Sequence, residues 1–97
     1  MVPANEIIKD TTATGGSFSW TKDGETARIQ FSTTSPVLVI ASSTQVPDAF
    51  RGQGVGDALL EAFVADARTN GYKIVPLCPF VKARAQRKPE WAEVFAR

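Results

Sequence analysis

The sequence predicts an α+β (α/β) domain, in which an antiparallel strand meander is followed by a helix, a parallel fifth strand and C-terminal helices. Alternating apolar and polar residues, broken by turn signals, fill the first half of the chain and are typical of strands joined by hairpins. Apolar residues then recur at helical spacing between Gly54 and Asn70. A short apolar run at 72–77 follows, and a strand after such a helix favours parallel pairing through a right-handed crossover.

The length and composition are those of one globular domain, which we expect to span residues 1–97. The chain has 97 residues, with 43% hydrophobic and 22% charged side chains, so disorder is not expected. No uninterrupted apolar run approaches the roughly 18–20 residues that cross a bilayer. The amino-terminal residues lack the basic start and long apolar centre of a signal peptide. A cytoplasmic protein with no membrane partner is therefore expected.

The first half divides into short strands and turns. The expected ranges are a weak strand at 5–10, a loop at 11–16, a strand at 17–21, a hairpin turn at 22–25, a strand at 26–31 and a turn at 32–36. Asp23 and Gly24 form a dipeptide typical of tight hairpins. In the strand after this turn, Ala27, Ile29 and Phe31 share one face.

The next strand is the most apolar. Residues 37–41 are continuously apolar and rich in β-branched side chains, which indicates a central strand covered on both faces. It is expected to extend through Val46 and to stop at Pro47, because proline cannot donate to a ladder. Four strands in succession indicate the meander.

The second half is helical except for the strand at 72–77. The helix from Gly54 ends at Asn70, with Gly71 suited to a left-handed cap. A basic helix is expected at 80–88, and Pro89 opens a last short one that carries Trp91, Val94 and Phe95. The expected core consists of Phe18, Trp20, Phe31, Leu38, Ile40, Leu59, Phe63, Ile74, Trp91 and Phe95.

The absence of histidine excludes several kinds of chemistry. Ser-His-Asp triads, Cys-His dyads and histidine zinc sites are impossible, and the single cysteine, Cys78, excludes a disulfide within the chain and a multi-thiolate metal site, so no metal is expected. A net charge of +1 argues against nucleic-acid binding. Residues 1–50 carry −2 and residues 51–97 carry +3, so an anionic ligand is expected in the second half.

A glycine-rich stretch at Arg51–Gly56 lies between the apolar strand and the long helix. Alternate glycines at 52, 54 and 56 allow a tight turn and close approach of a ligand to the backbone. The unpaired amides at the start of the helix attract phosphate. The alternative is a glycine-rich turn without a ligand.

The spacing of these glycines excludes two common phosphate loops. No Walker pattern is present, and the last glycine of a dinucleotide fingerprint falls on Asp57. The pattern [QR]-x-x-G-x-[GA], with Arg51, Gly54 and Gly56, resembles the pyrophosphate loop of the GNAT acyltransferase superfamily, which binds acetyl-coenzyme A. From Phe18 onward the chain resembles a compact GNAT-like subfamily, through Thr44–Pro47, Arg51–Gly56, Ala67-Arg68, Gly71, Pro76, Cys78–Val81 and Pro89-Glu90.

The resemblance implies how acetyl-coenzyme A is held. The fourth and fifth strands splay apart, and pantetheine bonds to the fourth strand in the opening. Pro76 fits a point where pairing has ended, or simply terminates its strand. The implied cofactor-binding residues are Thr44, Gln45 and Val46 for pantetheine and Arg51, Gly52, Gln53, Gly54, Val55 and Gly56 for pyrophosphate.

The basic helix offers further cations. Lys82 is read as a solvated surface residue, whereas Arg84 and Arg87 are expected to meet the 3′-phosphate or the pyrophosphate. Arg84, Arg87 and Lys88 share a face at helical spacing. The alternative for all of them is a solvated helix face.

Cys78 is the candidate catalytic residue. It ends the fifth strand, where the resemblance places the thioester, and it is either a nucleophile or a small buried spectator. Tyr72, at the other end of that strand, is expected to be structural. The subfamily commonly has a histidine and a tyrosine where this chain has Ser42-Ser43 and Phe31. The candidate bases acting through water are Asp48, Glu90 and Glu93.

The resemblance implies transfer of an acetyl group to an unidentified amine, on a small molecule or a protein lysine. Two alternatives stay open, namely a coenzyme-A-binding module without catalysis and a protein-interaction domain without cofactor. The chain is too short to contain all the elements that build an acceptor pocket in larger relatives. The acceptor site is therefore expected to be shallow or completed by a partner.

Overall fold

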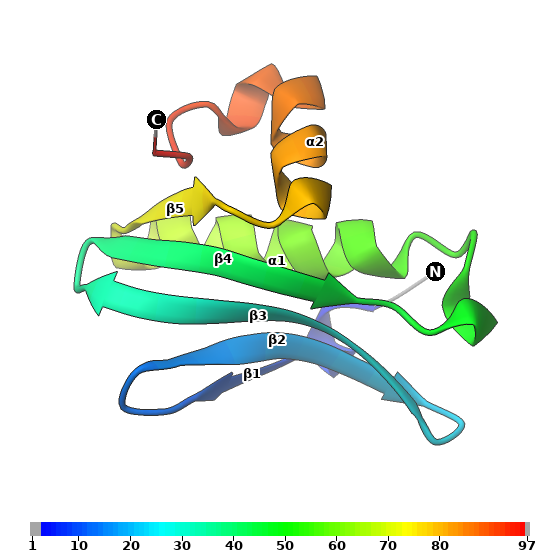
Figure 1. Ribbon diagram of the computed structural model, residues 1–97. Helices are drawn as coiled ribbons and strands as arrows, with labels where there is room; N and C mark the ends of the chain where they lie inside the picture. Colours follow the sequence, from blue (N-terminus) through cyan, green and yellow to red (C-terminus); the bar gives the residue numbers. More distant parts are fainter. Residues whose placement is uncertain (1–2, 97) are drawn as a thin grey trace.

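A mixed sheet of five strands forms one layer of the protein in a computed structural model, which describes residues 3–96 (Figure 1). The strands follow each other in space as they do in the chain, and only β4 and β5 pair in parallel. Their bounds are β1 Ile8–Thr11, β2 Gly15–Lys22, β3 Glu25–Ser35, β4 Leu38–Gln45 and β5 Lys73–Pro76. The predicted meander with a parallel fifth strand is confirmed.

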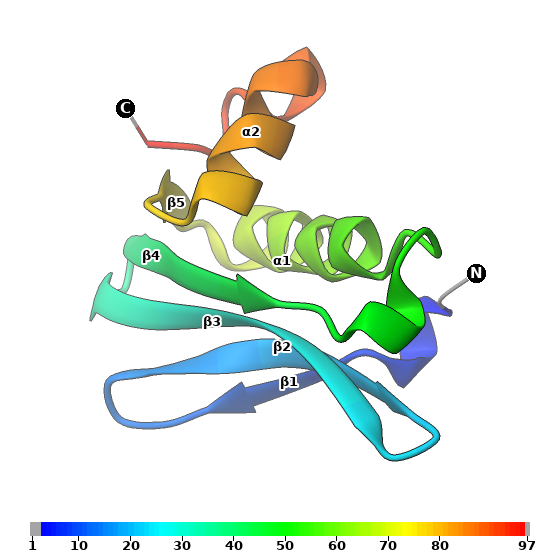
Figure 2. The same ribbon diagram turned by 45° about the vertical axis from the view of Figure 1, so that its right-hand side comes forward.

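Two helices lie on the same side of the sheet (Figure 2). Helix α1 spans Val55–Asn70 and connects β4 to β5, and α2 spans Pro79–Arg87 after β5. As predicted, α1 ends at Asn70 and is capped by a left-handed Gly71, whose N–H donates to the Ala67 carbonyl at 2.8 Å. Short 3₁₀ turns occupy Ala4–Glu6 (η1), Asp48–Phe50 (η2) and Pro89–Trp91 (η3).

The hydrophobic core lies between the sheet and the two helices. Phe63 of α1 is fully buried, and its ring centroid lies 4.9 Å from that of Phe18 and 5.4 Å from that of Phe31. Aromatic side chains from β2, β3 and α1 therefore form the centre of the core. Of the predicted core, Leu38, Ile40 and Phe95 are only partly buried.

The strand bounds near the amino terminus differ from those predicted. Residues 4–6 form a 3₁₀ turn rather than the start of β1. Gly15 and Gly16 belong to β2, because they pair with residues of the neighbouring strands. The approach requires glycine, since a Cβ on Gly15 would lie 2.2 Å from the Phe31 carbonyl oxygen. The predicted loop at 11–16 and turn at 32–36 were thus too long, since β3 continues to Ser35.

The prediction that β4 is covered on both faces was also wrong. Val39 and Ala41 are buried beneath the helices, whereas Leu38 and Ile40 are half-buried on the opposite face. Among residues 3–96, both helices pack on the first of these faces (Figure 2). A run of apolar side chains does not by itself show which face lacks a covering element.

The carboxy-terminal segment covers the outer edge of β5. The Ile74 N–H donates to the Val94 carbonyl and the Ala96 N–H to the Ile74 carbonyl, both at 2.8 Å. Phe95 forms a parallel bridge with Ile74 in place of the helical position predicted for it. In the part of the chain that the structure describes, no helix is long and apolar enough to cross a membrane.

Candidate functional site

Strand β4 continues beyond the point where β5 turns away from it. The last pair of the parallel ladder is Ala41 with Pro76, and the Cys78 N–H then donates to the Ala41 carbonyl at 2.9 Å. The chain enters α2 at Pro79, so β4 runs on to Gln45 with β3 on one side and no strand on the other within residues 3–96. The predicted separation of the fourth and fifth strands is therefore present.

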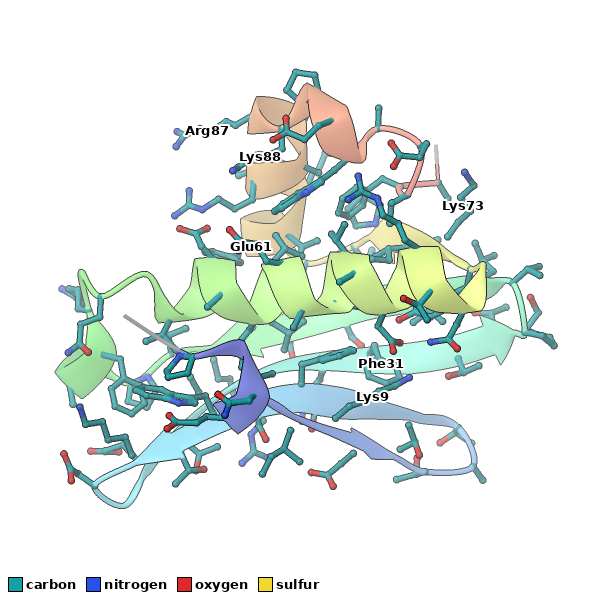
Figure 3. All side chains as sticks on the ribbon, turned by 180° about the vertical axis from the view of Figure 1, so that it is seen from behind. Lys9, Phe31, Glu61, Lys73, Arg87 and Lys88 are labelled. Carbon is teal, nitrogen blue, oxygen red and sulfur yellow. The ribbon has the colours of Figure 1, made fainter. Side chains whose placement is uncertain are left out.

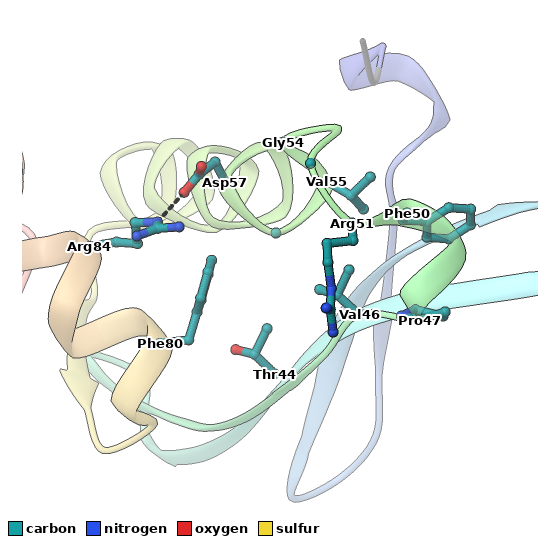
Figure 4. A pocket seen from close by; sticks show the side chains of 12 residues that line it. Thr44, Val46, Pro47, Phe50, Arg51, Gly54, Val55, Asp57, Phe80 and Arg84 are labelled. Carbon is teal, nitrogen blue, oxygen red and sulfur yellow. Dashed lines mark hydrogen bonds and ion pairs between the residues drawn. The ribbon is translucent and has the colours of Figure 1, made fainter.

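A cleft of about 620 Å³ opens beside this free edge (Figure 4). Its walls are the end of β4, the loop at 51–54, the first turn of α1 and the first turns of α2. The predicted cofactor-binding residues that line it are Thr44, Val46, Arg51, Gly52, Gly54, Val55, Gly56 and Arg84. Pro47, Phe50, Asp57 and Phe80 complete the lining.

The three glycines of the loop have different roles. Gly52 and Gly54 have φ angles of +80° and +72°, which other residues adopt at a cost, and a Cβ on either would meet no atom within 4 Å. Gly56 has no such φ, but a Cβ there would lie 2.8 Å from Cζ of Phe80. Gly52 and Gly54 therefore allow the backbone conformation of the loop and leave the space beside it open. Gly56 lets α2 pack against α1.

The first turn of α1 presents backbone amides to the cleft. The first hydrogen bond of this helix runs from the Ala58 N–H to the Gly54 carbonyl at 3.0 Å. The amides of Val55, Gly56 and Asp57 therefore precede the helical ladder, at the positive end of the helix dipole. Such a terminus attracts anions.

Two of the predicted cofactor-binding residues, one in the loop and one in β4, do not line the cleft. The Gln53 side chain donates to the Ala49 carbonyl at 3.0 Å and does not line the cleft. Gln45 is exposed and pairs with Arg28 in the ladder between β3 and β4, also outside the lining. Arg51 does line the cleft, and its Nη2 lies 2.9 Å from Oδ1 of Asp48.

Arg84 closes one side of the cleft together with Asp57. Its Nε lies 2.6 Å from Oδ1 of Asp57, and its guanidinium stacks 4.8 Å from the centroid of the Phe80 ring (Figure 4). Sequence reasoning missed the contributions of Asp57 and Phe80 to the lining. The sequence could have indicated them only by their positions, because each lies in the first turn of a helix that follows one of two neighbouring strands.

A second hollow of about 360 Å³ lies between α1 and the carboxy-terminal half of α2. Arg87, Lys88 and Glu61 line it (Figure 3), together with Asp57 and Arg84, which also line the first cleft. The predicted shared face of the basic residues is thus present. Arg87 belongs to this second hollow and not to the first.

Cys78 is buried immediately before α2, behind the cleft wall. Its Sγ lies 3.2 Å from Oγ1 of Thr44, and the residue is 5% exposed and absent from the lining. Burial by itself raises the pKa of the Cys78 thiol. Hydrogen bonds from the Thr44 hydroxyl and from the Val81 and Phe80 amides lower this pKa by more than burial raises it, so the pKa lies below its usual value.

The other groups considered for proton transfer lie outside the cleft lining. Tyr72 donates to Asp66 Oδ2 at 2.6 Å, beside the carboxyl end of α1. Glu93 is paired with Arg68, whose Nη2 also bonds the carbonyl of Glu90. A backbone hydrogen bond and Arg68 hold the pKa of Glu93 below its usual value.

No group of three or more potential metal ligands occurs among residues 3–96. The polar side chains that line the two hollows include Arg51, Arg84, Arg87 and Asp57, and the Cys78 thiol lies behind the first hollow.

Comparison with known proteins agrees with the fold. Residues 17–94 match the family model of the GCN5-related N-acetyl-transferases, and the chain belongs to this family. It is also similar to a GCN5-like protein from Staphylococcus aureus, solved by NMR in solution. The similarity has a TM-score of 0.69 at 25% sequence identity and covers 94% of this chain and 89% of that one. No curated protein sequence matches the chain.

Proposed function

We propose that the protein binds acetyl-coenzyme A in the cleft and transfers its acetyl group to an amine, on a small molecule or a protein lysine. The observation that carries this proposal is the placement of the free β4 edge beside the first turn of α1. The N–H and C=O groups of an unpaired strand edge can hydrogen-bond the amides of a pantetheine arm, and the N–H groups at a helix amino terminus donate to phosphate oxygens. Family membership supports the same cofactor.

The residues that line the cleft fit this cofactor. A volume of about 620 Å³ lies within the range of roughly 300–1,000 Å³ common for ligand sites. The space beside Gly52 and Gly54 is open, and the amides of Val55 and Gly56 precede the helical ladder. Arg51 and Arg84 add positive charge at two sides of the cleft.

Each part of the chain has a distinct role in this proposal. The backbone of Thr44, Gln45 and Val46 holds pantetheine, the loop at 51–56 holds the pyrophosphate, and Arg87 meets the 3′-phosphate in the second hollow. When bound, acetyl-coenzyme A supplies a thioester, whose carbonyl carbon is open to attack by an amine. The chain would position the thioester near Thr44 and shield it from water.

Cys78 is the candidate nucleophile for a covalent route. The hydrogen bonds from Thr44 and from the α2 amides lower the pKa of the thiol and thus raise its thiolate fraction. Mass spectrometry after incubation with labelled acetyl-coenzyme A tests the route. A label that is present in the natural protein and absent in Cys78→Ser would support it, whereas full turnover by Cys78→Ala would leave direct transfer.

A coenzyme-A-binding module without catalysis is the second candidate function. The chain has no histidine, and its single tyrosine is bonded to Asp66 outside the cleft. Asp57, the one carboxylate among the residues that line the cleft, is paired with Arg84, so none of these residues offers an unpaired acid or base for the amine and the leaving thiolate. Binding without turnover across a panel of amines would favour this function.

Calorimetry with acetyl-coenzyme A is the direct test of the cofactor. We expect Gly54→Glu to abolish binding, because it adds bulk and negative charge where the phosphates would lie. Gly24→Glu is the matched control: its φ is +81°, a Cβ there also meets nothing within 4 Å, and it lies in the hairpin between β2 and β3. Absence of binding by the natural protein at millimolar ligand would overturn the proposal.

A further inference from the structure

The Asp57–Arg84 ion pair lies at the border between the cleft and the second hollow. Both residues line both hollows, and the dashed line in Figure 4 marks their contact of 2.6 Å between Nε and Oδ1. Their side chains are 48% and 34% exposed, respectively, so water screens the pair only in part. A ligand that extends from one hollow to the other must pass this pair.

Asp57 places a carboxylate at the helix end where an anionic ligand would lie. It is the third residue of α1 and follows the free amides of Val55 and Gly56. The positive amino terminus of a helix stabilises either a carboxylate side chain or a bound phosphate. The Asp57 carboxylate and a bound phosphate therefore compete for the same positive helix end. They also repel each other as like charges.

Contacts with Phe80 and Asp57 hold the positive charge of Arg84 beside this carboxylate. Phe80 packs on Gly56 and supports the guanidinium from below, at 4.8 Å from its ring centroid. Within residues 3–96, the hydrogen bond of this guanidinium goes to Asp57 through Nε. A guanidinium has five N–H donors, so Arg84 can keep Asp57 and bond a phosphate oxygen as well.

We propose that Asp57 limits the affinity of the cleft for the cofactor phosphates and that Arg84 offsets this limit. The inference rests on the proposed function, because it concerns the affinity of that same site. The pair therefore sets how tightly the cofactor is held. Removing the carboxylate removes its repulsion of the phosphates, whereas removing the guanidinium leaves Asp57 facing the phosphates alone.

Calorimetry with coenzyme A on four proteins tests this inference: the natural chain, Asp57→Asn, Arg84→Gln and the double variant. We expect Asp57→Asn to bind about threefold to tenfold tighter and Arg84→Gln to bind about tenfold weaker. Loss of Arg84 should weaken binding less in the Asp57→Asn background than in the natural chain. Because screening by salt weakens the repulsion, the gain in Asp57→Asn should shrink as sodium chloride is raised.

Glu93→Gln is the matched control for charge. It also removes one carboxylate from an ion pair with an arginine, at 2.8 Å from Nη2 of Arg68, and lies outside both hollows. Its affinity for coenzyme A should equal that of the natural chain. Thermal unfolding followed by circular dichroism shows whether each variant folds, and Arg84→Met replaces Arg84→Gln if the latter does not.

The outcomes separate this inference from the proposed function. Unchanged or weaker binding by Asp57→Asn, with clear binding by the natural chain, overturns the inference and leaves the proposed function standing. An equal gain in Glu93→Gln also overturns it, because net charge alone would then explain the effect. Absence of binding by both the natural chain and Asp57→Asn overturns both.

Discussion

The ring of Phe80 packs directly on the backbone of Gly56, so that a Cβ at position 56 would lie 2.8 Å from Cζ of the ring. This contact brings α2 against the first turn of α1 and places Arg84 beside Asp57. The geometry of the cleft thus depends on a glycine that the sequence analysis assigned to a tight turn and to close approach of a ligand.

The first prediction concerns this contact. Gly56→Ala should destabilise the protein by about 1–3 kcal/mol, because overpacking against the ring outweighs the better helix propensity of alanine. Urea unfolding measures the change. In a Phe80→Leu background the cost of Gly56→Ala should shrink, since the smaller side chain leaves room for a methyl group. A Gly56→Ala variant more stable than the natural chain would contradict the contact.

The second prediction concerns the thiol. Thr44→Val should raise the pKa of Cys78, because it removes the hydroxyl that lies 3.2 Å from Sγ and favours the thiolate. Ultraviolet titration of the thiolate reports this pKa directly, since the chain has one cysteine. Thr44→Ser keeps the hydroxyl and serves as the control. Equal titration of all three proteins would show that Thr44 has no such effect.

The third prediction concerns Tyr72 and pH. Burial, the hydrogen bond to Asp66 and the charge of Asp66 raise the pKa of Tyr72 far above its usual value. The contribution of Tyr72 to the free energy of unfolding is therefore fully present below the pKa of about 10 that the tyrosine has in the unfolded chain. This contribution is lost as pH rises further, because Tyr72 then ionises only in the unfolded state.

Tyr72→Phe tests this sign. At neutral pH the variant should be about 1–3 kcal/mol less stable, because Asp66 loses a donor. The difference from the natural chain should narrow at pH above about 10 in urea unfolding. Its affinity for coenzyme A should be unchanged, since Tyr72 does not line the cleft. If the difference in the free energy of unfolding between the two proteins stays constant with pH, the pKa of Tyr72 is not raised.

The fourth prediction concerns the second hollow. Arg87→Gln should weaken binding of coenzyme A by about tenfold and leave binding of dephospho-coenzyme A unchanged, because Arg87 is proposed to meet the 3′-phosphate. Lys82→Gln is the control, since Lys82 is exposed on the same helix and lines neither hollow. Equal weakening for both ligands would place the 3′-phosphate elsewhere.

Local patterns in the sequence were sufficient for most of the fold. The hairpin at Asp23-Gly24 is present with φ angles of 54° and 81°, and α1 ends at Gly71 as predicted. Both depend on interactions within a few residues, which composition and spacing report directly. The loop at Arg51–Gly56 was found for the same reason, since its glycines and the following helix are neighbours in the chain.

Contacts between distant residues were decided only by the tertiary structure. Gly15 and Gly16 lie in a strand because they pair with residues of neighbouring strands, which approach them too closely for a side chain. The pairing of Arg84 with Asp57, 27 residues apart in the chain, follows from how α2 packs on Gly56. Periodicity shows which face of an element is apolar, but the packing of that face against another element determines which charges meet in the cleft.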